Sequence, residues 1–160
     1  MEMNILAIFV AALSALAIGF VWYNPKVFGN AWIRESGVIL EGAKKQNMIF
    51  VMVLSLIYAF LIAFSLQPIV IHQWGVIQAA GGDPTVAAPS LAAFMADYGT
   101  SHRHFGHGVL HGLIAGLFLI LPIFATTALY ERKSWKYVMI TAGYWIVCFM
   151  VMGGIICAWV

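Results

Sequence analysis

The stretch NILAIFVAALSALAIGFVWYN, residues 4–24, contains no Asp, Glu, Lys or Arg. It is long enough to cross the hydrocarbon core of a bilayer, which needs about 20 consecutive apolar residues in a helix. It ends in Trp22 and Tyr23, whose amphipathic rings suit the headgroup level, and Pro25 then disfavours helical geometry at Asn24. These features predict a membrane-spanning helix from about residue 5 to residue 23.

Three more charge-free stretches follow, at residues 46–82, 105–130 and 137–160. Over the whole chain 63% of the residues are hydrophobic and 9% are charged, whereas soluble domains have about 25% charged residues. The sequence therefore predicts an all-α integral membrane protein, a single domain over residues 1–160. We expect a four-transmembrane-helix bundle with a short external helical segment, with spans at about residues 5–23, 48–67, 108–130 and 137–158 and an external loop at about 68–107.

The basic residues are distributed unequally between the connecting segments. Seven of the eight follow the first span or lie between the third and fourth, and only Arg103 lies in the long second loop. Because short loops rich in Lys and Arg stay cytoplasmic, we expect a multi-pass protein of the cell inner (cytoplasmic) membrane with its N-terminus, second loop and C-terminus outside. A cleaved signal peptide is the alternative for the first span, but residues 1–4 lack the basic residue of a secretory signal.

Shorter elements are expected in the connections. Residues 26–36 mix aromatic and charged side chains, which favours a short helix lying in the membrane interface until Gly37, with a plain loop as the alternative. Residues 90–98 suit a short amphipathic external helix. The third long helix is expected to begin at Thr100 or Ser101, because either side chain can cap free N–H groups. Pro122 is expected to kink it.

Small residues recur at every fourth position on two of the predicted spans. Such stripes let two helix backbones approach closely, which matters in lipid because burial of apolar surface gives no net drive there. We expect tight packing along both stripes, within one chain or between two copies of it. The stripes are Ala7, Ala11, Ala15 and Gly19 on the first span and Gly108, Gly112 and Gly116 on the third.

Four of the five histidines lie close together in SHRHFGHGVLHG, residues 101–112. At about 100° per residue, His104, His107 and His111 share one helix face, whereas His102 would point almost oppositely. Imidazole suits a divalent transition metal such as zinc, so these three are the candidate ligands, with His72 or Asp97 as a further one. Histidines at a helix end can instead bond to carbonyls, meet lipid headgroups or face water, and these alternatives stay open.

Other chemistry is missing from the sequence. No Asp or Glu lies within a predicted span, and coupled transporters usually carry an ionisable group there. No phosphate-binding glycine loop, nucleophile elbow, cysteine-pair metal motif or dinucleotide fingerprint is present. A net charge of +2 gives no indication of nucleic-acid binding.

Several motifs resemble those of a bacterial membrane family catalogued as a domain of unknown function, number seventeen sixty-one. The resemblance is carried by GFVWYNPKVFG (residues 19–29) with Trp32 and ESG (35–37), and by FGHG (105–108), HG (111–112) and AGYW (142–145). It implies a small four-span bacterial membrane protein, and it supplies no activity, cofactor or catalytic residue.

The sequence alone favours a non-enzymatic membrane protein that is structural, self-associating or bound to a membrane-protein partner. Two alternatives are a metal-binding membrane protein or metal-dependent enzyme that uses the histidine cluster, and a small channel. We expect the protein to contact the lipid bilayer and not to bind nucleic acid.

Overall fold

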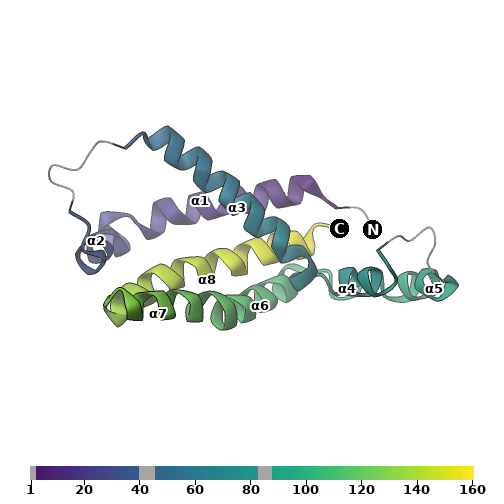
Figure 1. Cartoon of the computed structure of the whole chain (residues 1–160). Helices are drawn as coiled ribbons and strands as arrows, with labels where there is room; N and C mark the ends of the chain where they lie inside the picture. Colours follow the sequence, from purple (N-terminus) through teal and green to yellow (C-terminus); the bar gives the residue numbers. More distant parts are fainter. Residues whose placement is uncertain (1–2, 40–45, 83–87) are drawn as a thin grey trace.

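The structure is a computed structural model, and it describes residues 3–39, 46–82 and 88–160. These residues form helices and connections without any strand, which confirms the predicted all-α class. Figure 1 shows the elements, which are α1 (Ile5–Trp22), the π-helical turn η1 (Pro25–Gly29), α2 (Asn30–Ser36), α3 (Met48–Val70), α4 (His72–Ala79), α5 (Pro89–Tyr98), α6 (Phe105–Ala115), the π-helical turn η2 (Gly116–Ile120), α7 (Leu121–Tyr130) and α8 (Trp135–Ala158).

Four helices of the described chain are long and apolar enough to cross a membrane: α1, α3, the continuous helix α6–η2–α7, and α8. Their bounds lie within three residues of the predicted spans. The chain is therefore a multi-pass membrane protein. Each span begins at a polar side chain that accepts a backbone N–H three residues ahead, as expected of helix caps. The caps are Asn4, Asn47, His104 and Ser134.

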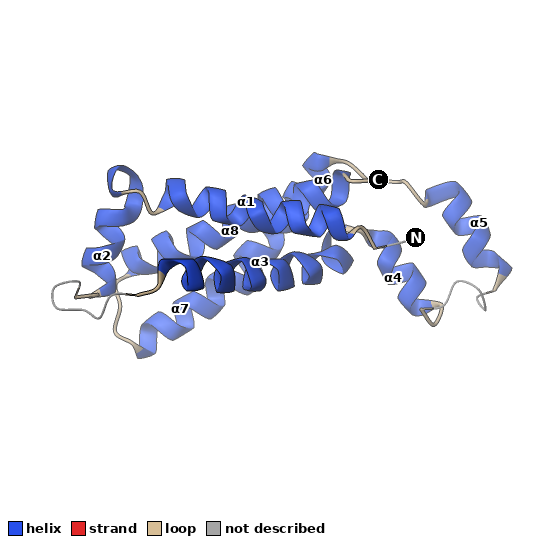
Figure 2. Ribbon diagram, turned by 90° about the horizontal axis from the view of Figure 1, so that it is seen from above, coloured by secondary structure: helices blue, strands red, loops and turns tan. Residues whose placement is uncertain are grey.

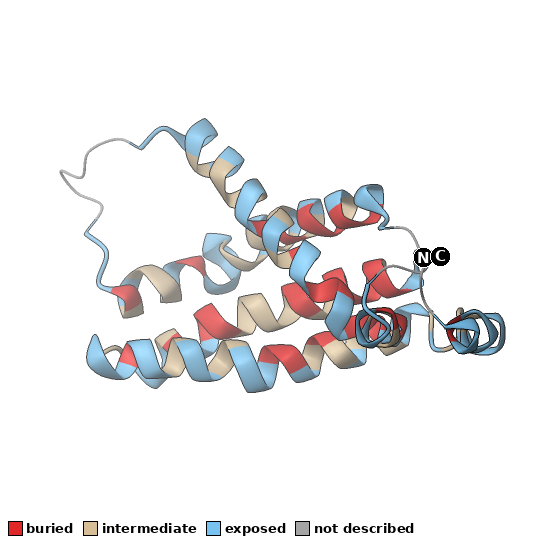
Figure 3. Ribbon diagram, turned by 45° about the vertical axis from the view of Figure 1, so that its right-hand side comes forward, coloured by how far each residue is buried: buried red, intermediate tan, exposed pale blue. Residues whose placement is uncertain are grey.

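Helix α8 is the centre of the bundle, because it packs against α6, α7, α1 and α3. Of the most apolar part of α8, 56% of the residues are buried, compared with 17–28% for the other three spans. Figure 3 shows the buried positions gathered where the helices meet, while the outward faces are exposed. Exposed apolar faces of this kind suit contact with lipid.

The glycine stripe of α6 packs directly on the backbone of α8. A Cβ atom added at Gly108 would lie 2.0 Å from the carbonyl oxygen of Gly153, and one added at Gly112 would lie 2.2 Å from that of Phe149. Only glycine allows this approach. Gly116 continues the same contact, since an added Cβ would lie 3.0 Å from the Cα of Ile146.

The stripe on α1 is also buried within the chain. Ala7, Ala11 and Ala15 are at most 2% exposed, and α1 packs against both α8 and α3. The Tyr144 hydroxyl of α8 donates to the Ala15 carbonyl at 3.1 Å and also lies against Gly19. The two stripes therefore serve helix packing inside one chain, and self-association stays a prediction.

The long third helix begins later than predicted. It starts at Phe105 with His104 as its cap, so the expected start at Thr100 or Ser101 is wrong. Residues 99–104 form turns instead, and His102 has a positive φ of 61°. Pro122, which has no N–H, lies in the first turn of α7, and the π-helical turn η2 directly precedes that helix.

The two ends of the bundle differ in what they carry (Figures 1 and 2). One end holds both termini, α4, α5 and the start of α6, and is called the histidine end below. The opposite end holds η1, α2 and the α7–α8 connection, and is called the basic end. Helix α5 matches the predicted external helix to within one residue, and α2 ends at Ser36 with Gly37 as its cap, where the sequence predicted the end of a short helix.

At the basic end, α2 is held against the start of α8. The Ser134 hydroxyl donates to Glu35 Oε2 at 2.7 Å, and the Lys133 ammonium donates to the Ser36 carbonyl. The hydrogen bond from Ser134, with the neighbouring Arg34, holds the pKa of Glu35 below its usual value. The Trp22 indole also donates to the Ile140 carbonyl at 3.0 Å, which ties the end of α1 to α8.

Candidate metal centre

His72 reaches the start of α6 because the chain bends between α3 and α4. Pro68 lies in the last turn of α3, and Ile71 adopts an extended conformation with φ −119° and ψ 103°. Helix α4 then begins at His72 in a new direction (Figure 1). The bend thus places a histidine that follows the second span beside the histidines at the start of the third.

Gln73 fixes the connection between α5 and α6 against α4. Its side chain is 3% exposed, and its Nε2 donates to the carbonyls of Tyr98 at 2.7 Å and Ser101 at 3.0 Å. From the other side, the Cys157 thiol of α8 donates to the His102 carbonyl at 3.3 Å. These contacts set the position of α4, and hence of His72, relative to α6.

His72, His107 and His111 converge into one cluster. Each offers a ring nitrogen, and these three atoms lie within 4.8 Å of one another. Nε2 of His72 and Nε2 of His107 are 2.9 Å apart. Zinc–nitrogen bonds of about 2.0–2.1 Å at tetrahedral angles separate the ligand atoms by about 3.3 Å. Side-chain rotations that bring the most widely separated nitrogens closer by up to about 1.5 Å would therefore place all three on one ion.

The remaining candidates lie around this cluster. His104, which the sequence grouped with His107 and His111, lies outside the group of three, and its Nδ1 accepts the His107 backbone N–H at 3.2 Å. The ring of His102 stacks on that of His107 with centroids 5.1 Å apart, so the expectation that it points away is wrong. That expectation assumed a helix at residue 102, where the structure has a turn. Asp97 lies on α5 and is outside the group of three.

The pair of facing nitrogens limits the protonation of the cluster. Two Nε2 atoms at 2.9 Å can share one proton, as donor and acceptor, but cannot both be protonated without repulsion. Neutral imidazoles with lone pairs directed at one point are the form that binds a metal ion.

The comparison with family models gives a match over residues 6–157, to a family described as a protein of unknown function (DUF1761). The chain belongs to this family. No curated protein and no solved structure matched it. The resemblance noted in the sequence is thereby confirmed, and since the DUF1761 description assigns no activity, the chemistry of this member rests on its own geometry.

A cavity of about 350 Å³ adjoins the cluster in this DUF1761 protein. It is lined by His72 and His102 together with Gln73, Val76, Phe94, Tyr98 and Ser101. Three imidazole ligands leave the fourth position of a tetrahedral ion open, as in catalytic zinc sites, where water or substrate occupies it. The cavity provides space for a small ligand beside His72.

Two residues that support the site were not found from the sequence. Gln73 and Cys157 belong to no motif, and their roles depend on contacts between segments 25 to 55 residues apart. His72 was only a secondary candidate, because a histidine 35 residues from His107 carries no spacing signal. The polar Gln73 directly after His72, in an otherwise apolar stretch, was the one feature of the sequence that could have indicated a site there.

Proposed function

We propose that this protein binds a divalent transition metal ion, such as zinc, through His72, His107 and His111. The observation that supports the proposal is the convergence of three ring nitrogens within 4.8 Å from two separate elements of the chain. An imidazole donor set suits Zn, Cu, Ni or Fe rather than Mg or Ca, which prefer oxygen ligands.

Metal binding explains features that packing or hydrogen bonding does not require. A hydrogen bond between imidazoles requires only two rings. Here three rings are gathered, with pairwise centroid distances of 4.5–4.9 Å. His107 and His111 are one helical turn apart, the spacing that lets two imidazoles on one helix chelate one ion. Nothing about an apolar core or a lipid face would favour gathering three such groups.

A metal-dependent enzyme is the second candidate, and the cavity beside His72 and His102 favours it. The open coordination position and the adjoining space would together admit a small substrate. Hydrolysis of a chromogenic ester by the metal-loaded protein, lost in a His72→Ala variant, would test this candidate. A structural or partner-binding role and a small channel stay predictions from the sequence.

We also propose that the histidine end lies outside the cytoplasm, in a cell inner membrane. The support is the concentration of Lys and Arg in the segments that lie at the basic end. Single cysteines introduced at Gln78 and Glu131, both exposed, should react oppositely with a membrane-impermeant maleimide in intact cells. The native Cys148 and Cys157 are buried and give a low background, and equal labelling of the two sites would contradict this orientation.

Elemental analysis tests the metal site itself. Detergent-purified protein without a histidine tag, prepared without chelators, should contain close to one metal ion per chain. A His72→Ala variant and a His107→Ala/His111→Ala variant should lose it. Folded wild-type protein that stays metal-free after zinc is added would overturn the proposal.

The matched control is His104→Asn. Asparagine is among the best helix caps, so this change keeps the cap of α6 while removing an imidazole next to the site. We expect the metal content to be retained. Loss of metal in this variant would return His104 to the ligand set that the sequence suggested.

A further inference from the structure

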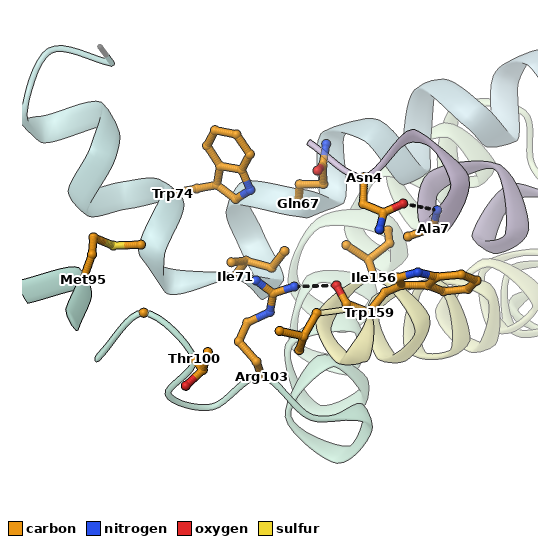
Figure 4. A pocket seen from close by; sticks show the side chains of 12 residues that line it. Asn4, Ala7, Gln67, Ile71, Trp74, Met95, Thr100, Arg103, Ile156 and Trp159 are labelled. Carbon is orange, nitrogen blue, oxygen red and sulfur yellow. Dashed lines mark hydrogen bonds between the residues drawn. The ribbon is translucent and has the colours of Figure 1, made fainter. Parts of the chain in front are cut away.

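A second cavity, separate from the one beside His102, opens at the histidine end, and the cationic side chain of Arg103 lines it. It has a volume of about 360 Å³ and lies where the start of α1, the end of α3, α4 and the end of α8 meet. Figure 4 shows Arg103 reaching from the α5–α6 connection into this space, between Ile71 and the Trp159 carbonyl. The cavity is therefore largely apolar with one guanidinium inside it.

Arg103 is only partly satisfied by the protein. Its Nε donates to the Cys157 carbonyl at 2.9 Å and its Nη2 donates to the Trp159 carbonyl at 2.8 Å. These bonds cap the end of α8, whose carbonyls carry partial negative charge. A guanidinium has five N–H donors, and the described residues accept from two of them, so three remain there for a ligand.

Within the described part of the chain, no Asp or Glu side chain pairs with Arg103. The ion pair found there, within 4.0 Å, joins Arg34 and Glu35 at the basic end. Partial burial of the Arg103 guanidinium costs it hydration and lowers its pKa from its ordinary value. An anion that entered the cavity would relieve this cost, because charge-assisted bonds strengthen where water is excluded.

The ends of the spans that surround the cavity lead us to expect it at the depth of lipid headgroups. Helix α1 begins at Ile5 and α8 ends at Ala158, so the residues just beyond these ends meet the membrane surface. Trp74 and Trp159, which line the cavity, are the amphipathic residue type enriched at that level. The lining also includes Ile71 and Ile156, which suit the glycerol and upper acyl region of a lipid.

Amide groups add further polar contacts around the cation. Asn4 and Gln67 both line the cavity, and Figure 4 shows them on the side opposite Arg103. Asn4 Oδ1 accepts the Ala7 backbone N–H at 3.0 Å, so its NH₂ group is the part left for a ligand. A phosphate oxygen on the guanidinium would thus have hydrogen-bond donors near it.

We propose that this cavity binds the phosphate of an anionic phospholipid, with the Arg103 guanidinium as the principal contact. Arginine recognises phosphate through paired N–H donors, and basic pockets between membrane helices bind anionic headgroups. None of His72, His107 and His111 lines this cavity, so the lipid proposal does not depend on the metal site.

The test is native mass spectrometry of the full chain, exchanged from detergent into mixtures of phosphatidylglycerol and phosphatidylcholine. Wild-type protein should retain phosphatidylglycerol in preference to phosphatidylcholine. In Arg103→Gln the apparent affinity for phosphatidylglycerol should fall about tenfold, the size expected from losing a charge-assisted interaction. The control, Arg132→Gln, changes an exposed arginine at the basic end and should bind as the wild type does.

A second variant covers the role of Arg103 in capping α8. Thr100 lines the cavity and is exposed, so Thr100→Trp should fill the space while leaving Arg103 in place. It should also lose phosphatidylglycerol. Unchanged lipid retention in Thr100→Trp, or equal loss in Arg132→Gln, would overturn the proposal. Displacement of the lipid by millimolar inorganic phosphate would reassign the cavity to a free phosphate ion and would overturn the lipid assignment too.

Discussion

Replacing Gly112 by alanine should separate the two most closely packed helices of the protein. The added Cβ would lie 2.2 Å from the carbonyl oxygen of Phe149, 2.6 Å from its carbonyl carbon and 2.8 Å from the Cα of Met150. All three are backbone atoms, so no side-chain rotation can relieve the contact. Because carbon and oxygen normally stay about 3.3 Å apart or more, α6 must move from α8 by roughly 1 Å.

The size of the effect follows from two opposing contributions. Forcing a methyl group into a filled contact costs about 1–3 kcal/mol. Alanine in place of glycine also favours the helix by up to about 1 kcal/mol. We therefore expect Gly112→Ala to lower the free energy of unfolding by about 1–2 kcal/mol. Close packing is a main source of helix association in lipid, so little can compensate for its loss.

The matched control is Gly75→Ala on α4. An added Cβ at Gly75 has no atom within 4 Å, so only the helix preference remains, and the variant should be unchanged or up to about 1 kcal/mol more stable. Denaturant titration in one detergent, followed by tryptophan fluorescence, compares the two variants. If Gly112→Ala proved as stable as the wild type, or if both variants shifted equally, the close α6–α8 contact would be refuted.

Three further predictions concern contacts that hold elements together. Gln73→Ala should weaken zinc binding roughly tenfold, since supporting residues orient the ligands, and titration with a competing zinc dye measures this. Tyr144→Phe removes the 3.1 Å bond to the Ala15 carbonyl and should lower the free energy of unfolding by about 1 kcal/mol, measured by denaturant titration. Ser134→Ala removes the 2.7 Å bond that lowers the pKa of Glu35, so that pKa should rise in a carboxyl NMR titration. The folded-state pKa of Glu35 lies below its unfolded-state pKa, so ionised Glu35 stabilises the fold at pH values above the unfolded-state pKa. This stabilisation is lost as the pH falls through the folded-state pKa. Ser134→Ala should therefore lose less stability than the wild type on acidification.

The sequence predicted the spans well because each is a charge-free run with a cap and an interfacial aromatic or basic flank. The first span, residues 5–23, differs from α1 by one residue. The second was predicted to end at residue 67, but α3 continues through Pro68 to Val70. A proline limits the residue before it only weakly when tertiary contacts hold the helix, and Val70 is fully buried.

The start of the third long helix could not be predicted from caps alone. Thr100 and Ser101 are suitable caps, but Gln73 binds the Ser101 carbonyl and Arg103 binds the end of α8, so these residues are held in turns. Contacts from distant segments thus override a local preference. The same error placed His102 on the wrong side of the cluster.

The sequence shows that the glycine stripe and two of the histidines lie on the same helix in a fixed relation, but only the structure shows which way those histidines face. His107 and His111 each precede a stripe residue, Gly108 and Gly112, so the histidine row lies about 100° around α6 from the glycine row. Once the glycines press against α8, the rotation of α6 is fixed, and the two histidines must face the neighbouring direction. The bend at Ile71 then delivers His72 to that face.

This dependence means that packing and ligand geometry are coupled in this protein. A change such as Gly112→Ala moves the helix that carries two of the three proposed ligands, while His72 stays with α4. A displacement of about 1 Å is enough to spoil a preorganised site. If the metal is bound as proposed, Gly112→Ala should lose zinc affinity as well as stability, although no ligand is altered, and Gly75→Ala should lose neither. Normal zinc affinity in a destabilised Gly112→Ala protein would show instead that the site does not depend on how α6 is packed.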